Sequence, residues 1–200
     1  MDSIIDILIA KEEKFKTIVE LYGRPVFVTR LPGFETLCLL ILEQQVSIDS
    51  AKATFLKIKK AIPNFIPGNI VVFSDEDFRS CGVSRQKTSY LKALSQAILD
   101  RQLDVESLAS KDAETVRAEL IQIKGIGHWT IDVYLMFCLQ SPDIIPLGDV
   151  AVVNTIKELF DIHDKETMES YAENWKPYRS GATFFLWHYY LRKRGRKNPY

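Results

Sequence analysis

Apolar residues recur at helical spacing along nearly the whole chain, and this feature limits the fold more than any other. Two of the clearest stretches hold Phe34, Leu37, Cys38 and Ile41, and Trp129, Val133, Met136 and Phe137. In each stretch the apolar residues fall on one face of a helix with 3.6 residues per turn. The only strand-like segment, residues 25–28, is too short to build a sheet. We therefore predict an all-α protein of about ten short helices.

Residues that favour helix N-caps and residues that break helices divide these stretches. The candidate N-caps are Ser47, Ser74, Ser84 and Asp149, each just before an apolar repeat. Proline and glycine interrupt the chain within residues 63–68 and again within 142–148. We expect a middle lobe of residues 35–130 and a second lobe that combines residues 1–34 with 131–200. A cleft between two such lobes is where an active site is expected.

Composition excludes several classes of protein. Hydrophobic residues make up 46% of the chain and charged residues 26%, which is typical of a folded soluble protein rather than a membrane protein. The N-terminus lacks the basic flank and cleavage site of a secretory signal. The three cysteines are widely spaced and odd in number, which indicates reduced thiols in the cytoplasm of a prokaryote or the nucleus of a eukaryote. Scattered histidines and the lack of a C-x-x-C pair argue against metal catalysis.

Charge does not decide the function. The formal net charge is zero, which by itself does not indicate a nucleic-acid partner. Residues 192–197 form a basic tail, and four lysines cluster within residues 52–60. A solvated surface explains such clusters as well as a DNA contact does.

The most informative stretch is a pair of glycines between two helical patterns, in residues 120–130. Gly125 and Gly127 are one residue apart, and a new apolar helix follows at once. Glycine adopts positive φ and lets another backbone approach closely, and the free amides of the next helix favour an anion. Ile126 between the glycines would anchor the turn in the core. A plain helix-ending turn is the default explanation of two glycines alone. A turn followed by free helix amides would also suit a DNA phosphate.

Asp149 is the second candidate functional residue. It follows Gly148 and precedes an apolar helix, so an N-cap role explains its position without any chemistry. The same position orients the carboxylate and favours its charged form, because a helix N-terminus attracts anions. The two interpretations are therefore compatible.

Several blocks resemble the helix–hairpin–helix (HhH-GPD) DNA glycosylase superfamily. Residues 120–130 resemble its L-P-G-I-G-x-W-T-A hairpin, with Lys124 in place of proline and Ile131 in place of alanine. The Pro146–Asp149 loop, P-L-G-D, resembles the segment that carries the family's essential aspartate. Residues 44–47 (Q-Q-V-S), 82–87 (G-V-S-R-Q-K) and 175–180 (W-K-P-Y-R-S) follow the family's order, and the last of these resembles the 3-methyladenine DNA glycosylase II branch.

The resemblance implies a two-lobed all-α HhH-GPD fold, with its helix–hairpin–helix at residues 120–137, and a hydrolytic function. Asp149 would stabilise the positive charge that develops on the deoxyribose, or would orient or deprotonate the attacking water. Trp129 stands where bifunctional members carry a catalytic lysine, which implies a glycosylase without lyase activity. Alkylated purines are cationic and leave readily, so they are the expected substrates.

The resemblance also implies a set of binding residues. We expect the base pocket to include Trp129, Trp187, Tyr134 and Asp132, although most aromatic residues of this kind pack in a core and Asp132 is equally a candidate salt-bridge partner. The expected DNA contacts are Gln44, Gln45, Ser47, Lys124, Gly125, Ile126, Gly127, His128 and Thr130, with Gln45 as the residue that wedges into the duplex. Ser180 is a further candidate for a contact with the DNA backbone. Arg179 is expected to form a structural ion pair.

No cofactor is expected for catalysis. In the family the hairpin often holds a monovalent cation, Na⁺ or K⁺. By position its ligands here would be the backbone carbonyls of Ile121, Ile123 and Ile126.

We therefore expect a monomeric DNA repair glycosylase that flips alkylated purines out of double-stranded DNA, with no membrane partner. Two alternatives stay open: a non-catalytic DNA-binding helix–hairpin–helix module, and a bifunctional glycosylase-lyase for oxidised bases. A helical adaptor is disfavoured because several ordered blocks match. The lesion range, which includes 3-methyladenine, 7-methylguanine, ethenoadenine and hypoxanthine, is left open.

Overall fold

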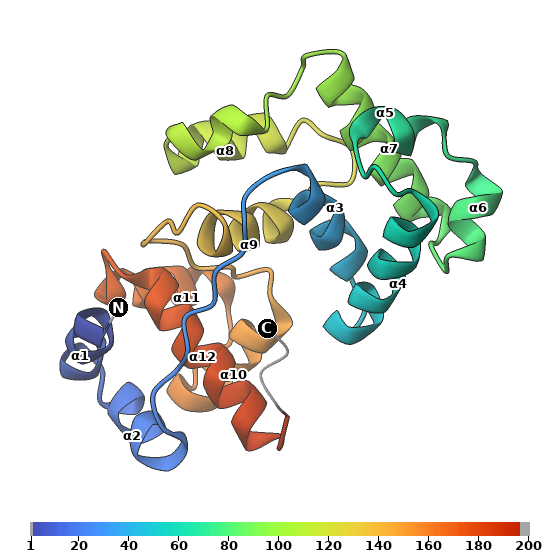
Figure 1. Cartoon of the computed structure of the whole chain (residues 1–200). Coiled ribbons are helices and arrows are strands. Elements are labelled where there is room, and N and C mark those ends of the chain that lie inside the picture. The colour runs from blue at the N-terminus through green and yellow to red at the C-terminus, as the bar shows by residue number, and fades with distance from the viewer. Residues whose placement is uncertain (1, 197–200) are drawn as a thin grey trace. The chain divides into compact units, whose positions relative to one another are not determined.

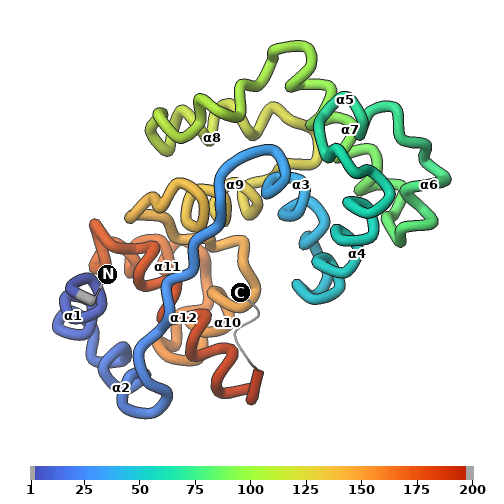
Figure 2. Tube along the Cα trace, viewed as in Figure 1, coloured from blue at the N-terminus to red at the C-terminus, as the bar shows by residue number. Residues whose placement is uncertain are grey.

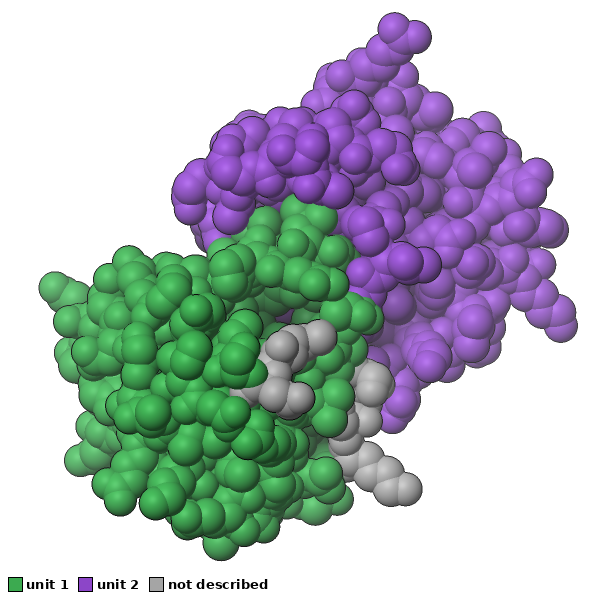
Figure 3. Space-filling view, turned by 60° about the vertical axis from the view of Figure 1, so that its left-hand side comes forward, with its two compact units in different colours: residues 1–29, 135–200 green, residues 30–134 purple. Residues whose placement is uncertain are grey.

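The structure is a computed structural model that describes residues 2–196. It confirms the all-α prediction, because the described residues form twelve α-helices and two short 3₁₀ helices with no strand (Figure 1). The chain divides into two compact units, coloured separately in Figure 3. Unit 1 combines Met1–Thr29 with Leu135–Tyr200, and unit 2 is Arg30–Tyr134. These divisions differ by about four or five residues from the lobes that we expected, as is usual for boundaries taken from sequence.

Unit 2 is built around a long central helix. Its helices are α3 (Phe34–Glu43), α4 (Ile48–Ala61), α5 (Pro67–Val72), α6 (Asp75–Ser80), α7 (Arg85–Leu99), η1 (Glu106–Ser110) and α8 (Ala113–Leu120). Helices α3, α5 and α6 all pack on α7, whose Leu91 and Leu94 are fully buried. Ser47, Ser74 and Ser84 each accept an amide hydrogen bond at the start of α4, α6 and α7. The three predicted serine N-caps are thus confirmed.

Unit 1 is built around the last helix. Its elements are α1 (Asp2–Lys11), α2 (Glu13–Tyr22), α10 (Val150–Phe160), α11 (Lys165–Ala172), η2 (Glu173–Trp175) and α12 (Arg179–Lys193). Helix α12 contacts α1, α2, α10 and η2, so it forms the centre of this unit. Phe15 of α2 stacks on Phe185 of α12 at 4.6 Å between ring centroids. At Gly181 an added Cβ would lie 2.8 Å from Leu8 Cδ1, which shows how closely α1 packs on α12.

Two segments connect these elements. Helix α9 (His128–Phe137) begins in unit 2 and ends in unit 1. Residues 23–33 run without regular secondary structure from α2 to α3, as the trace in Figure 2 shows. Phe27 of this segment stacks on Phe184 of α12 at 4.8 Å. The strand-like residues 25–28 therefore pack on a helix and do not form a strand.

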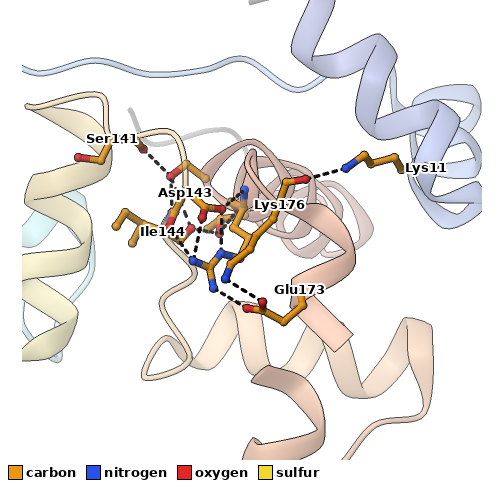
Figure 4. Close-up of polar contacts among 9 residues, drawn as sticks. Lys11, Ser141, Asp143, Ile144, Glu173 and Lys176 are labelled. Atoms are coloured by element: carbon orange, nitrogen blue, oxygen red, sulfur yellow. Dashed lines mark hydrogen bonds and ion pairs between the residues drawn. The ribbon is translucent and has the colours of Figure 1, made fainter. Parts of the chain in front are cut away.

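A polar network holds the start of α12 (Figure 4). Arg179 donates to Asp143 Oδ1 at 2.8 Å and to Oδ2 at 2.9 Å, and it also pairs with Glu173. The prediction of a structural ion pair at Arg179 is confirmed. Ser180 is buried; its hydroxyl donates to the Ser141 carbonyl at 2.6 Å and accepts from the Ile144 amide. Our expectation that Ser180 contacts DNA is therefore wrong, because its hydroxyl is buried and hydrogen-bonded within unit 1.

The three cysteines are buried free thiols, which agrees with the prediction that they form no disulfide. No helix in residues 2–196 combines the length and apolar character that a membrane span requires.

Candidate functional site

The Asp149 carboxylate is held by three hydrogen-bond donors. Asp149 is the N-cap of α10, and its Oδ1 accepts from the amides of Ala151 at 2.9 Å and Val152 at 3.0 Å. Trp187 of α12 donates its indole Nε1–H to the same oxygen at 3.2 Å. The predicted N-cap is thus confirmed. These three N–H donors hold the carboxylate in one orientation.

Trp187 packs in the core of unit 1 and also lines a pocket there. Its side chain is 8% exposed and packs against Phe137 at 5.5 Å and Phe184 at 5.7 Å, as a core residue does. It also lines a pocket in unit 1, whose other lining residues are Val26, Val28, Phe184, His188, Leu191, Arg192 and Arg196. Burial lowers the pKa of His188 below its ordinary value, which favours the neutral ring at pH 7. The lining of this pocket therefore combines apolar side chains with the two arginines.

The glycine turn of unit 2 follows α8, which ends at Leu120. Gly125 has φ +92°, and an added Cβ would lie 2.1 Å from the Tyr90 ring, so both the backbone and the packing require glycine. Gly127 is different: its φ is not positive, and an added Cβ would meet nothing within 4 Å. The packing of this chain does not explain the second glycine, whereas a close approach by another molecule would.

The remaining hairpin residues divide into buried and exposed groups. Ile126 is buried, as predicted for the residue that anchors the turn, and its amide donates to the Ile123 carbonyl at 3.0 Å. Lys124, Gly127 and His128 are exposed, and Trp129 is half-buried. Of the exposed residues, Gly127 and His128 lie at the start of α9, where free helix amides favour an anion.

The turn between α3 and α4 lies next to this hairpin in unit 2. The Gln44 side chain donates to the Gly125 carbonyl at 2.8 Å and to the Thr130 hydroxyl at 3.0 Å. Gln45 has φ +58° and is exposed. Ser47 accepts from the Ser50 amide at 3.3 Å.

Four of the expected binding residues therefore have roles inside the protein. Thr130 is 1% exposed and its hydroxyl accepts from Gln44, so its side chain is not presented to DNA. The side-chain NH₂ group of Gln44 likewise donates both of its hydrogen bonds within unit 2. Tyr134 is 0% exposed and its hydroxyl accepts from the Gly33 amide at 3.1 Å, so it belongs to the core and not to an open pocket. Asp132 pairs with Arg117 at 2.7 Å, which is the salt-bridge alternative.

A monovalent cation at the hairpin stays a prediction. The Ile123 carbonyl already accepts one hydrogen bond, from the Ile126 amide, and a carbonyl oxygen retains a second lone pair. Ile121 is exposed at the end of α8. No group of three His, Cys, Asp or Glu side chains suited to a metal ion occurs in residues 2–196.

Sequence reasoning missed an ion pair near the α3–α4 turn. Arg30 donates two hydrogen bonds to Glu43, at 2.9 and 3.0 Å, and only 3% of the Glu43 side chain is exposed. Charged and polar residues at the end of an apolar helix were the available signal. Only the fold shows that Arg30 is the partner of Glu43.

Comparison with known proteins identifies relatives of both the sequence and the fold. Residues 38–180 match the model of the HhH-GPD superfamily base excision DNA repair proteins. A DNA-3-methyladenine glycosylase of Bacillus subtilis is 28% identical over 193 residues, which cover 87% of this chain and 64% of that protein. A crystal structure of a DNA-3-methyladenine glycosidase from Bacillus halodurans is similar with a TM-score of 0.80 and 27% identity, and it covers 96% of this chain and 91% of that chain. The 3-methyladenine DNA glycosylase of Schizosaccharomyces pombe, in complex with abasic DNA, has a TM-score of 0.77 and 29% identity, with coverage of 88% and 90%.

Proposed function

Because the chain belongs to the HhH-GPD superfamily of base excision DNA repair proteins, we propose that it is a monofunctional DNA glycosylase. In this proposal it hydrolyses the N-glycosidic bond of alkylated purines of the 3-methyladenine type in double-stranded DNA. The observation that carries the proposal is the Asp149 carboxylate, held by two α10 amides and the Trp187 indole. The names of the relatives support the choice of substrate.

The chemistry follows from that carboxylate. Cleavage of the glycosidic bond develops positive charge on the deoxyribose, and a fixed anion facing the sugar stabilises it. Because the three donors to Oδ1 already orient the group, little reorganisation is required when the charge appears. In this proposal the same carboxylate also orients, or accepts a proton from, the attacking water. N3- and N7-alkylated purines carry a positive charge and leave without protonation, so no general acid is required.

The absence of a lysine at position 129 supports hydrolysis without strand cleavage. A lyase needs an amine that forms a Schiff base with the sugar, and Trp129 has none. We propose that Trp129 and Trp187 contact the everted base through their electron-rich rings. Borohydride should therefore trap no covalent protein–DNA adduct.

The hairpin supplies the DNA grip in this proposal. The open surface at Gly127, the exposed Lys124 and the start of α9 suit a backbone phosphate. Gln45 is the proposed wedge, and Na⁺ or K⁺ on the carbonyls of Ile121, Ile123 and Ile126 would add positive charge beside that phosphate. We propose that the protein acts as a monomer, in the cytoplasm of a prokaryote or the nucleus of a eukaryote.

The test is base release from duplexes that carry 3-methyladenine, 7-methylguanine, hypoxanthine or ethenoadenine. The wild-type protein should produce abasic sites on one or more of them, and Asp149→Asn should lower the single-turnover rate by about 10²–10³-fold, as loss of a group that stabilises the transition state does. Binding to an abasic-site duplex serves as the control, because Asp149→Asn should retain it. DNA binding without base release by the wild type would instead indicate a non-catalytic module.

A further inference from the structure

The end of α3 is anchored at three successive residues. Lys87 of α7 donates its ammonium to the Leu42 carbonyl at 2.6 Å. Glu43 accepts two hydrogen bonds from Arg30. Gln44 then donates to the hairpin. Each anchor comes from a different segment of unit 2, so the backbone leaving α3 has little freedom.

The residue that follows these anchors has an uncommon conformation. Gln45 has φ +58°, in the left-handed region that non-glycine residues rarely adopt. Such a conformation persists where the surrounding structure holds it, and it is concentrated at functional sites. Gln45 is exposed, and the next residue, Val46, exposes 45% of its surface. The anchors therefore hold a strained turn that projects from the unit.

Gln44 joins this turn to both sides of the glycine hairpin. Its carboxamide nitrogen has two N–H donors; one bonds the carbonyl of Gly125 in the turn and the other bonds Thr130 in the first turn of α9. Gly125 and Thr130 flank the exposed residues Gly127 and His128. One side chain thus fixes the spacing between Gln45 and the surface proposed to grip phosphate.

We propose that Gln44 is a positioning residue that couples the Gln45 turn to the hairpin. Entry of Gln45 into the duplex and capture of the phosphate then occur as one rigid step, which sets the efficiency of nucleotide eversion. This inference rests on the proposed function. It assigns Gln44 no contact with the substrate, because its donors are spent on Gly125 and Thr130.

The test variant is Gln44→Met, which keeps the length of the side chain and removes both donors. Eversion is followed by the fluorescence of 2-aminopurine beside a hypoxanthine in a duplex, and base release by single-turnover excision. Loss of two hydrogen bonds should slow both processes about tenfold on a fully paired site. On the same lesion placed opposite a one-nucleotide gap, where less base pairing and stacking opposes eversion, the effect should be less than about twofold.

Two controls separate positioning from a general structural defect. Gln96→Met makes the same chemical change at an exposed α7 residue that bonds only Asp100 Oδ1 across one helical turn, and it should change neither rate. Thr130→Val removes one of the two acceptors and should give a smaller defect in the same direction as Gln44→Met. It also keeps the test available if Gln44→Met does not fold.

A double variant provides the decisive outcome. If Gln44 acts by placing Gln45, then Gln44→Met should have less than about twofold further effect in a Gln45→Ala background. Equal effects of Gln44→Met in both backgrounds, or on paired and gapped sites alike, would overturn the inference. If the wild type everts the nucleotide but releases no base from any of the four lesions, the proposed function fails while the fluorescence still tests the coupling. No eversion of any of these lesions by the wild type would overturn both.

Discussion

At the scale of single residues, the two hairpin glycines are needed for different reasons. Gly125 has a positive φ and lies against the Tyr90 ring, whereas Gly127 has neither constraint. A methyl group at position 125 would therefore clash with the Tyr90 ring of the same protein. A methyl group at position 127 would clash only with a ligand that approaches the turn.

We expect Gly125→Ala to destabilise the protein by about 3 kcal/mol, from a left-handed backbone and an overpacked contact with Tyr90. Gly127→Ala should leave the free energy of unfolding within about 0.5 kcal/mol of the wild type and weaken DNA binding. Urea denaturation and titration of a fluorescent duplex measure the two effects. Equal stability losses in both variants would contradict this distinction.

The indole of Trp187 allows a second test at this scale. Trp187→Phe keeps an aromatic ring but removes the donor to Asp149 Oδ1. A hydrogen bond to a charged group contributes about 1.5–3 kcal/mol, so the single-turnover rate should fall about tenfold or more. Binding to an abasic-site duplex should be retained. An unchanged rate would mean that the two α10 amides orient the carboxylate without the indole.

At the scale of elements, the end of α3 depends on a buried ion pair. Arg30 and Glu43 are 14% and 3% exposed, so either charge left alone would be poorly solvated. The pair between Lys59 of α4 and Glu35 of α3 has similar distances but is far more exposed, at 38% and 51%. The two pairs thus provide a matched comparison of buried and exposed charges within one unit.

Arg30→Met should destabilise the protein by about 3–5 kcal/mol, because it leaves the Glu43 charge buried. Lys59→Met should cost at most about 1 kcal/mol. The double variant Arg30→Met with Glu43→Met should recover most of the loss, because the uncompensated charge is gone. Chemical denaturation of all three variants tests this. A double variant as unstable as Arg30→Met alone would show that packing, and not charge, is responsible.

At the scale of the whole molecule, each of the two units has its own buried core. In unit 1, protonation of Asp143 at low pH should lower the stability of the fold. Partial burial alone would raise the pKa of Asp143, but the hydrogen bonds and charge of Arg179 outweigh it and hold the pKa below the ordinary value of 3.8. A carboxyl group with a lowered pKa stabilises the folded state above its unfolded pKa. That contribution is lost as the pH falls through the folded value.

The melting temperature of the whole protein should therefore drop more steeply below about pH 4 than that of Asp143→Asn, which has no carboxyl group to protonate. Above that pH the difference between the two proteins should be constant. Differential scanning calorimetry from pH 2.5 to 7 measures both curves. Parallel curves over the whole range would show that the Arg179 pair does not contribute to acid sensitivity.

Features that depend on neighbouring residues could be predicted from the sequence alone. The helical class, the serine N-caps and the Asp149 cap follow from apolar spacing and from side chains that bond amides two or three positions away. The buried Ile126 in the hairpin was predicted on the same local basis. In these cases the interacting groups are close along the chain, so a short stretch contains the whole cause.

Which of the candidate residues reach a surface could not be predicted from the sequence. Gln44 meets Gly125 across 81 positions, and Trp187 meets Asp149 across 38. No local pattern encodes such partners, because they depend on how helices pack. Thr130 and Tyr134 have the same residue types as binding residues, yet the fold buries them and spends their hydroxyls. Burial and hydrogen-bond partners are properties of the packed chain. They distinguish residues that support a site from inside the fold from exposed residues that can contact a substrate.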